Sequence, residues 1–241
     1  MNRPAVGIVA LVLVLAAPSA FAGVIKGVLR IPATVAPIAA PDPYPGQAGA
    51  LPDVAPIVHG QVSDAVVYVE SIPGQADSVL AKDAQPPQMA QKGQNFVPRV
   101  VAVPAGGVVV FPNFDPIFHN AFSISPIKRF DLGKYPRGQS RRVTFPKPGV
   151  VHVFCDIHAN MAAYILVLPN RAFAQPDGFG EFELPNLPAG SYRVKVWHPD
   201  MPALERRVEL QAKGVVHLNL GYDKSPSQGV ADADSRGDGK P

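Results

Sequence analysis

A single cysteine closes an apolar run in the second half of the chain, and two other side chains with metal-binding atoms follow it. In the stretch VFCDIHANM, Cys155 stands three positions before His158 and six before Met161, and it is the only cysteine among 241 residues. A second imidazole, His119, follows an earlier apolar run in FPNFDPIFHN. A thiolate, two imidazoles and a thioether that meet at one point make the trigonal site with a weak axial sulfur that marks blue copper. The residue types and their spacing therefore predict one copper site built from these four side chains.

Other chemistries account for the same residues less completely. A structural zinc site draws its ligands from cysteine, histidine and carboxylate, and a thioether is a poor substitute. Haem attachment requires C-x-x-C-H and a dithiol redox site requires C-x-x-C, and the sequence contains neither. A cysteine nucleophile activated by histidine remains an alternative, although it gives Met161 no role. A buried cysteine without any chemistry is the other alternative.

Residues 1–22 have the layout of a secretory signal peptide. One basic residue precedes an apolar stretch from Val6 to Ala17, and small residues end at Ala22. This pattern predicts cleavage after Ala22 and export to the periplasm or beyond, with an uncleaved anchor as the alternative. An exported chain uses cysteines in pairs, so the unpaired Cys155 needs another kind of partner. We expect no membrane span after cleavage. The small net charge says little about partners, and because the chain is expected to be exported we expect no nucleic-acid partner.

The composition predicts an all-β chain, because 28 prolines and 21 glycines favour strands and turns over helical bundles. Between residues 85 and 169, short apolar runs alternate with Pro/Gly turns at a spacing that is typical of a Greek-key sandwich. Residues 170–222 hold too few strands to bury a core. We expect two orphan strands, at 24–31 and 65–70 within an N-terminal segment 23–72, to complete a small second sandwich. The first sandwich would then be inserted in the second or lie adjacent to it.

Two further segments lack a strand pattern. Seven prolines between Pro32 and Pro56 predict an extended linker over residues 32–63. Residues 223–241 are polar and patternless, and we expect them to form a disordered tail.

The motifs around the predicted ligands resemble those of the cupredoxins. The pattern F-x-N-x-D-x-x-x-H-N begins at Phe111 and ends at Asn120, and C-x-x-H-x-x-M follows it; the short ligand loop is most similar to that of the amicyanins. The segment QNFVPRVVAVPAGGVVVFPN is similar to the opening strands of the family, so the resemblance covers residues 85–169. It implies that His119, Cys155 and His158 are equatorial ligands of a type-1 copper, that Met161 is the axial ligand, and that Asn120 hydrogen-bonds near the thiolate and ties two loops together. Ala159 departs from the proline that amicyanin-like loops often carry.

A second resemblance concerns the flanking segments. The stretch from Gly180 to Val196, GEFELPNLPAGSYRVKV, resembles carboxypeptidase-regulatory or transthyretin-like β-sandwich modules. Those modules open with strands similar to residues 27–29 and 65–69, which supports the insertion inferred from strand counting. Together, the two features resemble exported bacterial proteins of the methylamine-utilisation type.

Two surfaces near the predicted site could contact a partner. The segment from Lys128 to Lys147 contains seven basic residues and one acid, which predicts either a solvated hairpin or a docking surface for an acidic redox partner. The cations assigned to this docking surface are Lys128, Arg129, Lys134, Arg137, Arg141 and Arg142. The apolar or small residues expected around the exposed edge of His158 are Pro112, Pro116, Ile117, Phe118, Ala159 and Met161.

Taken together, these features predict an exported copper protein that carries single electrons between periplasmic partners of the cytochrome or dehydrogenase type, without enzymatic activity of its own. Copper delivery or storage through the same ligands is the first alternative. A structural β-sandwich protein with an incidental metal site is the second.

Overall fold

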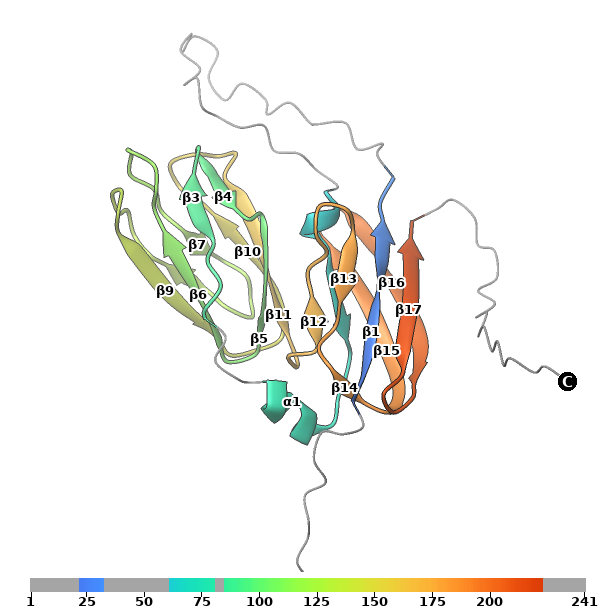
Figure 1. The fold of residues 1–241 in the computed structure, drawn as a ribbon. Helices are drawn as coiled ribbons and strands as arrows, with labels where there is room; N and C mark the ends of the chain where they lie inside the picture. Colours follow the sequence, from blue (N-terminus) through green and yellow to red (C-terminus); the bar gives the residue numbers. More distant parts are fainter. Residues whose placement is uncertain (1–21, 33–60, 81–84, 223–241) are drawn as a thin grey trace, which may run out of the picture.

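A computed structural model describes residues 22–32, 61–80 and 85–222 (Figure 1). The predicted all-β class is confirmed, because nearly all regular elements of the described residues are strands. The only helical elements there are a 3-10 turn, η1 (Val62–Asp64), and one short helix, α1 (Gly74–Leu80), which the all-β prediction did not include. Almost all of the predicted signal peptide, most of the proline-rich linker and the predicted tail lie outside the described residues. No helix within the described ranges is long and apolar enough to cross a membrane.

The middle sandwich, residues 85–169, consists of two layers of strands. One layer is a sheet with the order β5 (Val100–Pro104), β11 (Ala162–Leu168), β10 (Gly149–Phe154), β7 (Phe122–Ser123) and β8 (Phe130–Asp131). The other contains the pairs β3 (Ala90–Lys92) with β4 (Asn95–Val97) and β6 (Gly107–Pro112) with β9 (Ser140–Phe145). Isolated bridges from Gln88 to Val110 and from Gln91 to Asn113 bring β3 beside β6.

The core of the middle sandwich follows from strand alternation. In β10, Val151 and Val153 are fully buried while His152 between them is exposed, since successive side chains point to opposite faces. The buried side chains of facing strands, such as Phe111 and Ile165, belong to the same apolar cluster. Cys155 and Met161 also belong to this cluster, so the proposed sulfur ligands lie at the end of the core and not on the surface.

The outer sandwich is built from strands on both sides of the middle one in sequence. In its first sheet, β1 (Ala22–Arg30) pairs with β13 (Glu181–Glu183), β14 (Leu187–Pro188) and β17 (Val215–Gly221). Its second sheet has the order β12 (Phe173–Ala174), β2 (Val66–Val69), β15 (Gly190–His198) and β16 (Met201–Leu210). The chain leaves β2, forms the middle sandwich and returns to β12, which is antiparallel to β2.

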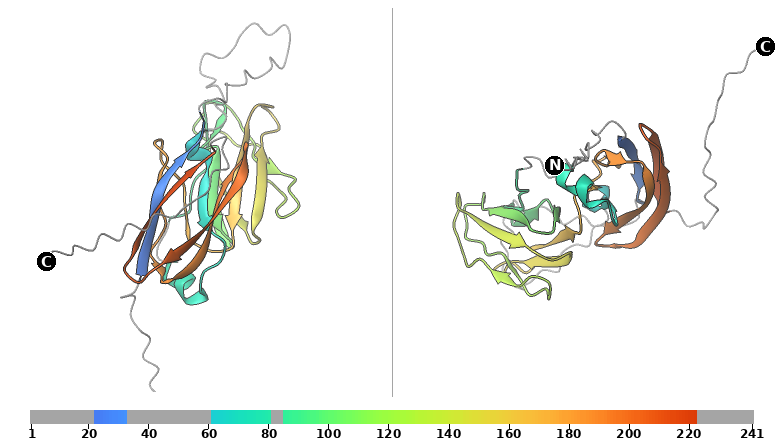
Figure 2. Two further views of the ribbon diagram at one scale, coloured as in Figure 1. Left: turned by 90° about the vertical axis from the view of Figure 1, so that its right-hand side faces the viewer. Right: turned by 90° about the horizontal axis from the view of Figure 1, so that it is seen from below.

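The two sandwiches lie side by side (Figures 1 and 2) and share an apolar contact. Val66 of the outer sandwich belongs to the same buried cluster as Val100 and Leu166 of the middle one. Arg99 joins the two units, because its guanidinium binds the carboxylates of Asp64 at 2.9 Å and Asp200 at 2.8 Å.

Aromatic rings continue this contact from one sandwich to the other. The ring of His152 lies 4.8 Å from that of Tyr164, which lies 6.0 Å from that of Trp197, the only tryptophan of the chain. The apolar cluster, the charged contacts and the rings together fix how the sandwiches sit against each other.

Candidate metal centre

The predicted ligands come from two loops at one end of the middle sandwich. Cys155 directly follows β10 and Met161 directly precedes β11, so their loop joins two paired strands, with Phe154 opposite Ala162. The loop is closed by hydrogen bonds from the backbone N–H of Met161 to the carbonyl of His158 (3.0 Å) and from the N–H of Cys155 to the carbonyl of Met161 (3.3 Å). A short loop between paired strands therefore brings three of the four predicted ligands to one place.

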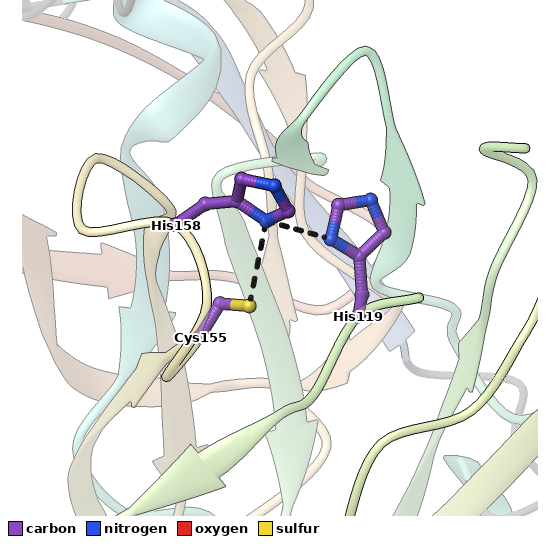
Figure 3. Close-up of side chains that lie close together, drawn as sticks. All are labelled: His119, Cys155 and His158. Atoms are coloured by element: carbon purple, nitrogen blue, oxygen red, sulfur yellow. Dashed lines mark hydrogen bonds between the residues drawn. The ribbon is translucent and has the colours of Figure 1, made fainter. Parts of the chain in front are cut away.

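The three strongest candidate ligands form a small triangle (Figure 3). Nδ1 of His119 lies 3.1 Å from Nδ1 of His158, and Sγ of Cys155 lies 3.9 Å from the same His158 atom. All three donor atoms are within 4.8 Å of one another. Nitrogen and sulfur atoms bound to one first-row metal at about 2.0–2.3 Å lie roughly 3–4 Å apart. The triangle has the size and the donor set to hold a single soft or borderline metal ion.

Burial separates the ligands into an inner and an outer part. His119 is 0% exposed, Met161 is 1% exposed and Cys155 is 6% exposed, whereas His158 is only partly buried. Met161 packs in the same apolar cluster as Cys155, on the core side of the site. Among the four predicted ligands, His158 is thus the one through which the site reaches the surface.

The surroundings of Cys155 favour the thiolate. Burial alone would raise the pKa of the thiol, but hydrogen bonds from His119 and from the backbone N–H groups of Asn120, Ile157 and His158 outweigh it and lower the pKa below its usual range. A lowered pKa supplies the deprotonated sulfur that binds metals.

Asp115 binds His119 on the side of the ring that faces away from the other ligands. Its Oδ2 lies 2.8 Å from Nε2 of His119, and its two oxygens accept hydrogen bonds from the backbone N–H groups of Gly93 (2.7 Å) and Gln94 (2.9 Å). Burial raises the pKa of Asp115, but these donors lower it overall, so the carboxylate stays charged. A carboxylate that accepts from Nε2–H leaves Nδ1 of His119 to face the other ligands.

The pKa values of the two histidines shift in opposite directions, because their neighbours differ. Burial lowers the pKa of His119, but the hydrogen bonds with Cys155 and Asp115 raise it overall. For His158, burial and the nearby His119 both lower the pKa, which favours the neutral ring that binds metals.

The loop that carries His119 is organised by buried amides. Asn113 donates from Nδ2 to the carbonyls of Ile117 (2.9 Å) and Tyr135 (3.0 Å), and its Oδ1 accepts from the N–H of Asp115 (2.9 Å). Gln91, which is 0% exposed, donates to the hydroxyl of Tyr135 at 2.8 Å. The sequence predicted no role for Gln91 or Asp115, although Asp115 is the acidic position of the pattern F-x-N-x-D-x-x-x-H-N, four residues before His119.

Asn120 contacts the site through its backbone rather than its side chain. Its N–H is one of the donors to the Cys155 sulfur, whereas its side-chain Nδ2 donates to Oδ1 of Asp131 at 2.7 Å. The side chain therefore ties the His119 loop to β8, and the contact near the thiolate belongs to the main chain.

The predicted docking cations do not gather at one point. Lys134 lies 3.8 Å from Asp156, the residue after Cys155, and Arg137 lines a pocket that also includes Asp115. Arg141 is held over the ring of Tyr135 at 5.1 Å. For the remaining members, Lys128, Arg129 and Arg142, nothing in the described part of the chain connects them to the ligands.

Exposed apolar side chains accompany the site. Phe118, next to His119, is 56% exposed, and Ile157, next to His158, is 41% exposed. Phe118 belongs to the predicted apolar set, whereas Met161 of that set is buried and Ile157 was not included in it.

No family model and no curated protein matches the chain. Solved structures that match part of it include cupredoxins and a copper enzyme. A Cu-containing nitrite reductase from Thermus scotoductus SA-01 is 30% identical over 35% of this chain and 23% of its own, so the match spans about a quarter of that enzyme, with a TM-score of 0.34. A purple cupredoxin from Nitrosopumilus maritimus (22% identity, 34% of this chain, 98% of its own) has a TM-score of 0.31. Amicyanin from Paracoccus versutus (20% identity, 42% and 96%) has a TM-score of 0.33.

Proposed function

We propose that His119, Cys155 and His158 hold one type-1 copper ion, with Met161 as the axial ligand, and that the protein is a one-electron carrier. The observation that carries this proposal is the Cys–His–His triangle, of which Cys155 and His119 are buried, and in which hydrogen bonds lower the pKa of the thiol. Bound copper would supply reversible one-electron chemistry between its two oxidation states. The donor set suits both states, because thiolate and thioether favour the reduced ion and imidazole accepts either.

The protein's own contribution is a rigid frame. Paired strands β10 and β11 fix both ends of the ligand loop, and Asp115 fixes the orientation of His119. Ligands that are buried and hydrogen-bonded move little when the charge at the site changes, which supports rapid electron transfer. Partly exposed His158, beside Ile157, offers the place where a partner comes closest to the ligands.

The cellular setting is part of the same proposal. We propose that the chain is exported to the periplasm through residues 1–22 and exchanges electrons with a cytochrome or dehydrogenase, without catalysing a reaction itself. A transthyretin-like outer sandwich also belongs to this proposal; the two four-stranded sheets around β1 and β2 are compatible with it.

Copper delivery is the second candidate function. The residues around His158 in the ligand loop, Asp156, Ile157 and Ala159, are all exposed, so a receiving protein could reach the ion from this side. Release would require the ligand loop to open, which its two backbone hydrogen bonds oppose.

Loading the purified protein with Cu(II) tests the proposal. We expect an intense thiolate-to-copper charge-transfer band that disappears in Cys155→Ser and persists in His217→Gln, which removes an exposed imidazole of the outer sandwich. A colourless protein, or a band that survives Cys155→Ser, would end the type-1 proposal. Repeated reduction and reoxidation without loss of copper to a Cu(I) chelator supports the carrier, whereas release to the chelator supports delivery.

A further inference from the structure

A surface pocket of about 590 Å³ lies next to Asp115, on the inner-histidine side of the site. It is lined by Lys92, Gly93, Phe114, Asp115 and Arg137. These residues come from three places: the end of β3 with the turn that follows it, the loop before His119, and the loop between β8 and β9. The pocket is therefore formed only when the hairpin of β3 and β4 is folded against the loop that carries His119.

The charges in this pocket are not neutralised from within. Lys92 and Arg137 are both exposed, and neither forms an ion pair with another residue of the described ranges. Asp115 does not answer them, because it is 7% exposed and its two oxygens already accept from Gly93, Gln94 and His119. The pocket thus contains two solvent-exposed cations, and the oxygens of its one acidic residue, Asp115, already accept hydrogen bonds from other groups.

The remaining wall is apolar. Phe114 lines the pocket with a ring that is half exposed, and its backbone N–H is held by the carbonyl of Gln91 at 2.9 Å. An exposed aromatic ring in the same pocket as two cations is a surface on which the side chain of a bound partner can pack while its carboxylates meet the charges.

We propose that this pocket binds carboxylate side chains of an acidic protein partner. The inference rests on the proposed function, because it adds to the partner's approach at His158 a second contact of the same redox partner beside Asp115, which bonds directly to the predicted ligand His119. A guanidinium can hold a carboxylate with two parallel hydrogen bonds, and an ammonium adds a point charge. Complementary charge of this kind raises the rate of encounter and fixes the orientation of the partner.

The geometry selects Arg137 from the basic segment and adds Lys92, which lies far from it in sequence. Arg141 is already engaged with the Tyr135 ring and with Gln139, and Lys134 has Asp156 beside it. Lys147 follows Phe145, which pairs with Gly107 at the end of β6 opposite to the ligand loops. Lys147 therefore offers a matched control with the same charge on the same segment.

In the test, a hexaglutamate peptide is titrated into the metal-free protein at low salt, and calorimetry measures the binding. We expect saturable binding that weakens with salt and a loss of affinity of about tenfold or more in the double variant Lys92→Gln, Arg137→Gln. Lys147→Gln should bind as the parent does, and a hexaglutamine peptide should not bind. Amide NMR shifts at Gly93 and Phe114 on titration would place the peptide in the pocket.

Several results would overturn the proposal. Absence of saturable binding, or equal weakening by Lys147→Gln, would mean that the pocket has no special affinity for carboxylates. Inorganic phosphate binding as tightly as hexaglutamate would identify a small-anion site and not a protein contact. Because copper is absent from this titration, its outcome is independent of whether the protein binds copper.

A second arm tests the redox role in copper-loaded protein. The double variant should slow electron exchange with the anion hexacyanoferrate(III), which takes one electron from the reduced protein, and leave exchange with a cationic cobalt(III) complex unchanged or faster. Equal slowing with both reagents would overturn the assignment of the pocket as a charge-selective contact. A protein that binds hexaglutamate but forms no coloured copper site would refute the proposed function and not the pocket.

Discussion

Replacing Asp115 with asparagine should weaken copper binding, although Asp115 is not itself a predicted ligand. Its two oxygens accept from three donors, the backbone N–H groups of Gly93 and Gln94 and Nε2–H of His119. An asparagine amide accepts at one atom and only donates at the other. If the NH₂ group faces His119, Nε2 must accept, and the ring proton moves to Nδ1, the nitrogen that faces His158. If it faces the hairpin, a backbone N–H loses its acceptor.

Both arrangements have a cost that can be estimated. Loss of the group that orients a histidine ligand lowers metal affinity about 10- to 100-fold, which corresponds to about 1.4–2.7 kcal/mol. An unsatisfied buried donor costs about 1–3 kcal/mol of folding free energy in the metal-free protein. Water cannot replace the contact to His119, because this side chain is 0% exposed.

Competition with a chromophoric chelator measures the copper affinity, and denaturant unfolding of the metal-free protein measures stability. Asp156→Asn is the matched control, since it removes the same charge beside Cys155 from a side chain that is 45% exposed and touches no ligand. An affinity within about twofold of the parent in Asp115→Asn, or an equal loss in Asp156→Asn, would refute the role of Asp115 in orienting His119.

Three further outcomes are expected. Arg99→Met should destabilise the protein by about 3–5 kcal/mol in denaturant unfolding, because it leaves Asp64 buried without its partner; an effect below about 1 kcal/mol, the value of a surface pair, would contradict a structural role. Ile165→Ala should lower the free energy of unfolding by about 2–5 kcal/mol, measured in denaturant, because it opens a cavity in the core of the middle sandwich. An unfolding transition that loses its cooperativity would contradict this prediction. Burial lowers the pKa of His198 from 6.5 despite its bond to the Gln61 carbonyl, so the unfolded chain binds its proton more readily. Stability should therefore be full above pH 6.5 and fall as the pH drops through the lower folded-state pKa, and His198→Gln should remove this part of the pH dependence.

Local patterns were sufficient for the elements and for the residue types of the site. The apolar runs expected between residues 85 and 169 form strands, for example around Val101, Val109, Val143 and Val151, because a half-buried strand has a period of two. The segment after Pro73 was the exception: a short helix forms there, and Asp77 of that helix binds the backbone N–H of Arg171. A contact between residues so far apart leaves no trace in the local pattern.

The same limit explains what the sequence did not reveal around the ligands. Lys92 and Gln91 reach the site through the pairing of β3 beside β6, and neither residue carries a motif. The basic segment suggested a docking surface by charge alone, but charge density does not tell which side chains are already engaged, as Arg141 is. Spacing predicts which side chains can meet, and only the fold decides which of them remain free to bind something else.

The connection from β2 to β12 has a consequence for the modularity of the chain. These strands are antiparallel neighbours, with Tyr68 opposite Phe173 and the N–H of Val69 bonded to the carbonyl of Ala172. Topologically, the whole middle sandwich is the loop of a β-hairpin, and its two ends are anchored about 5 Å apart. Loop-closure entropy rises only with the logarithm of length, so a hairpin accepts a folded insert as readily as a long flexible one. The outer sandwich can thus act as a scaffold in which one inserted domain replaces another between β2 and β12. Because an inserted domain is attached through two chain segments, it cannot rotate about a single hinge.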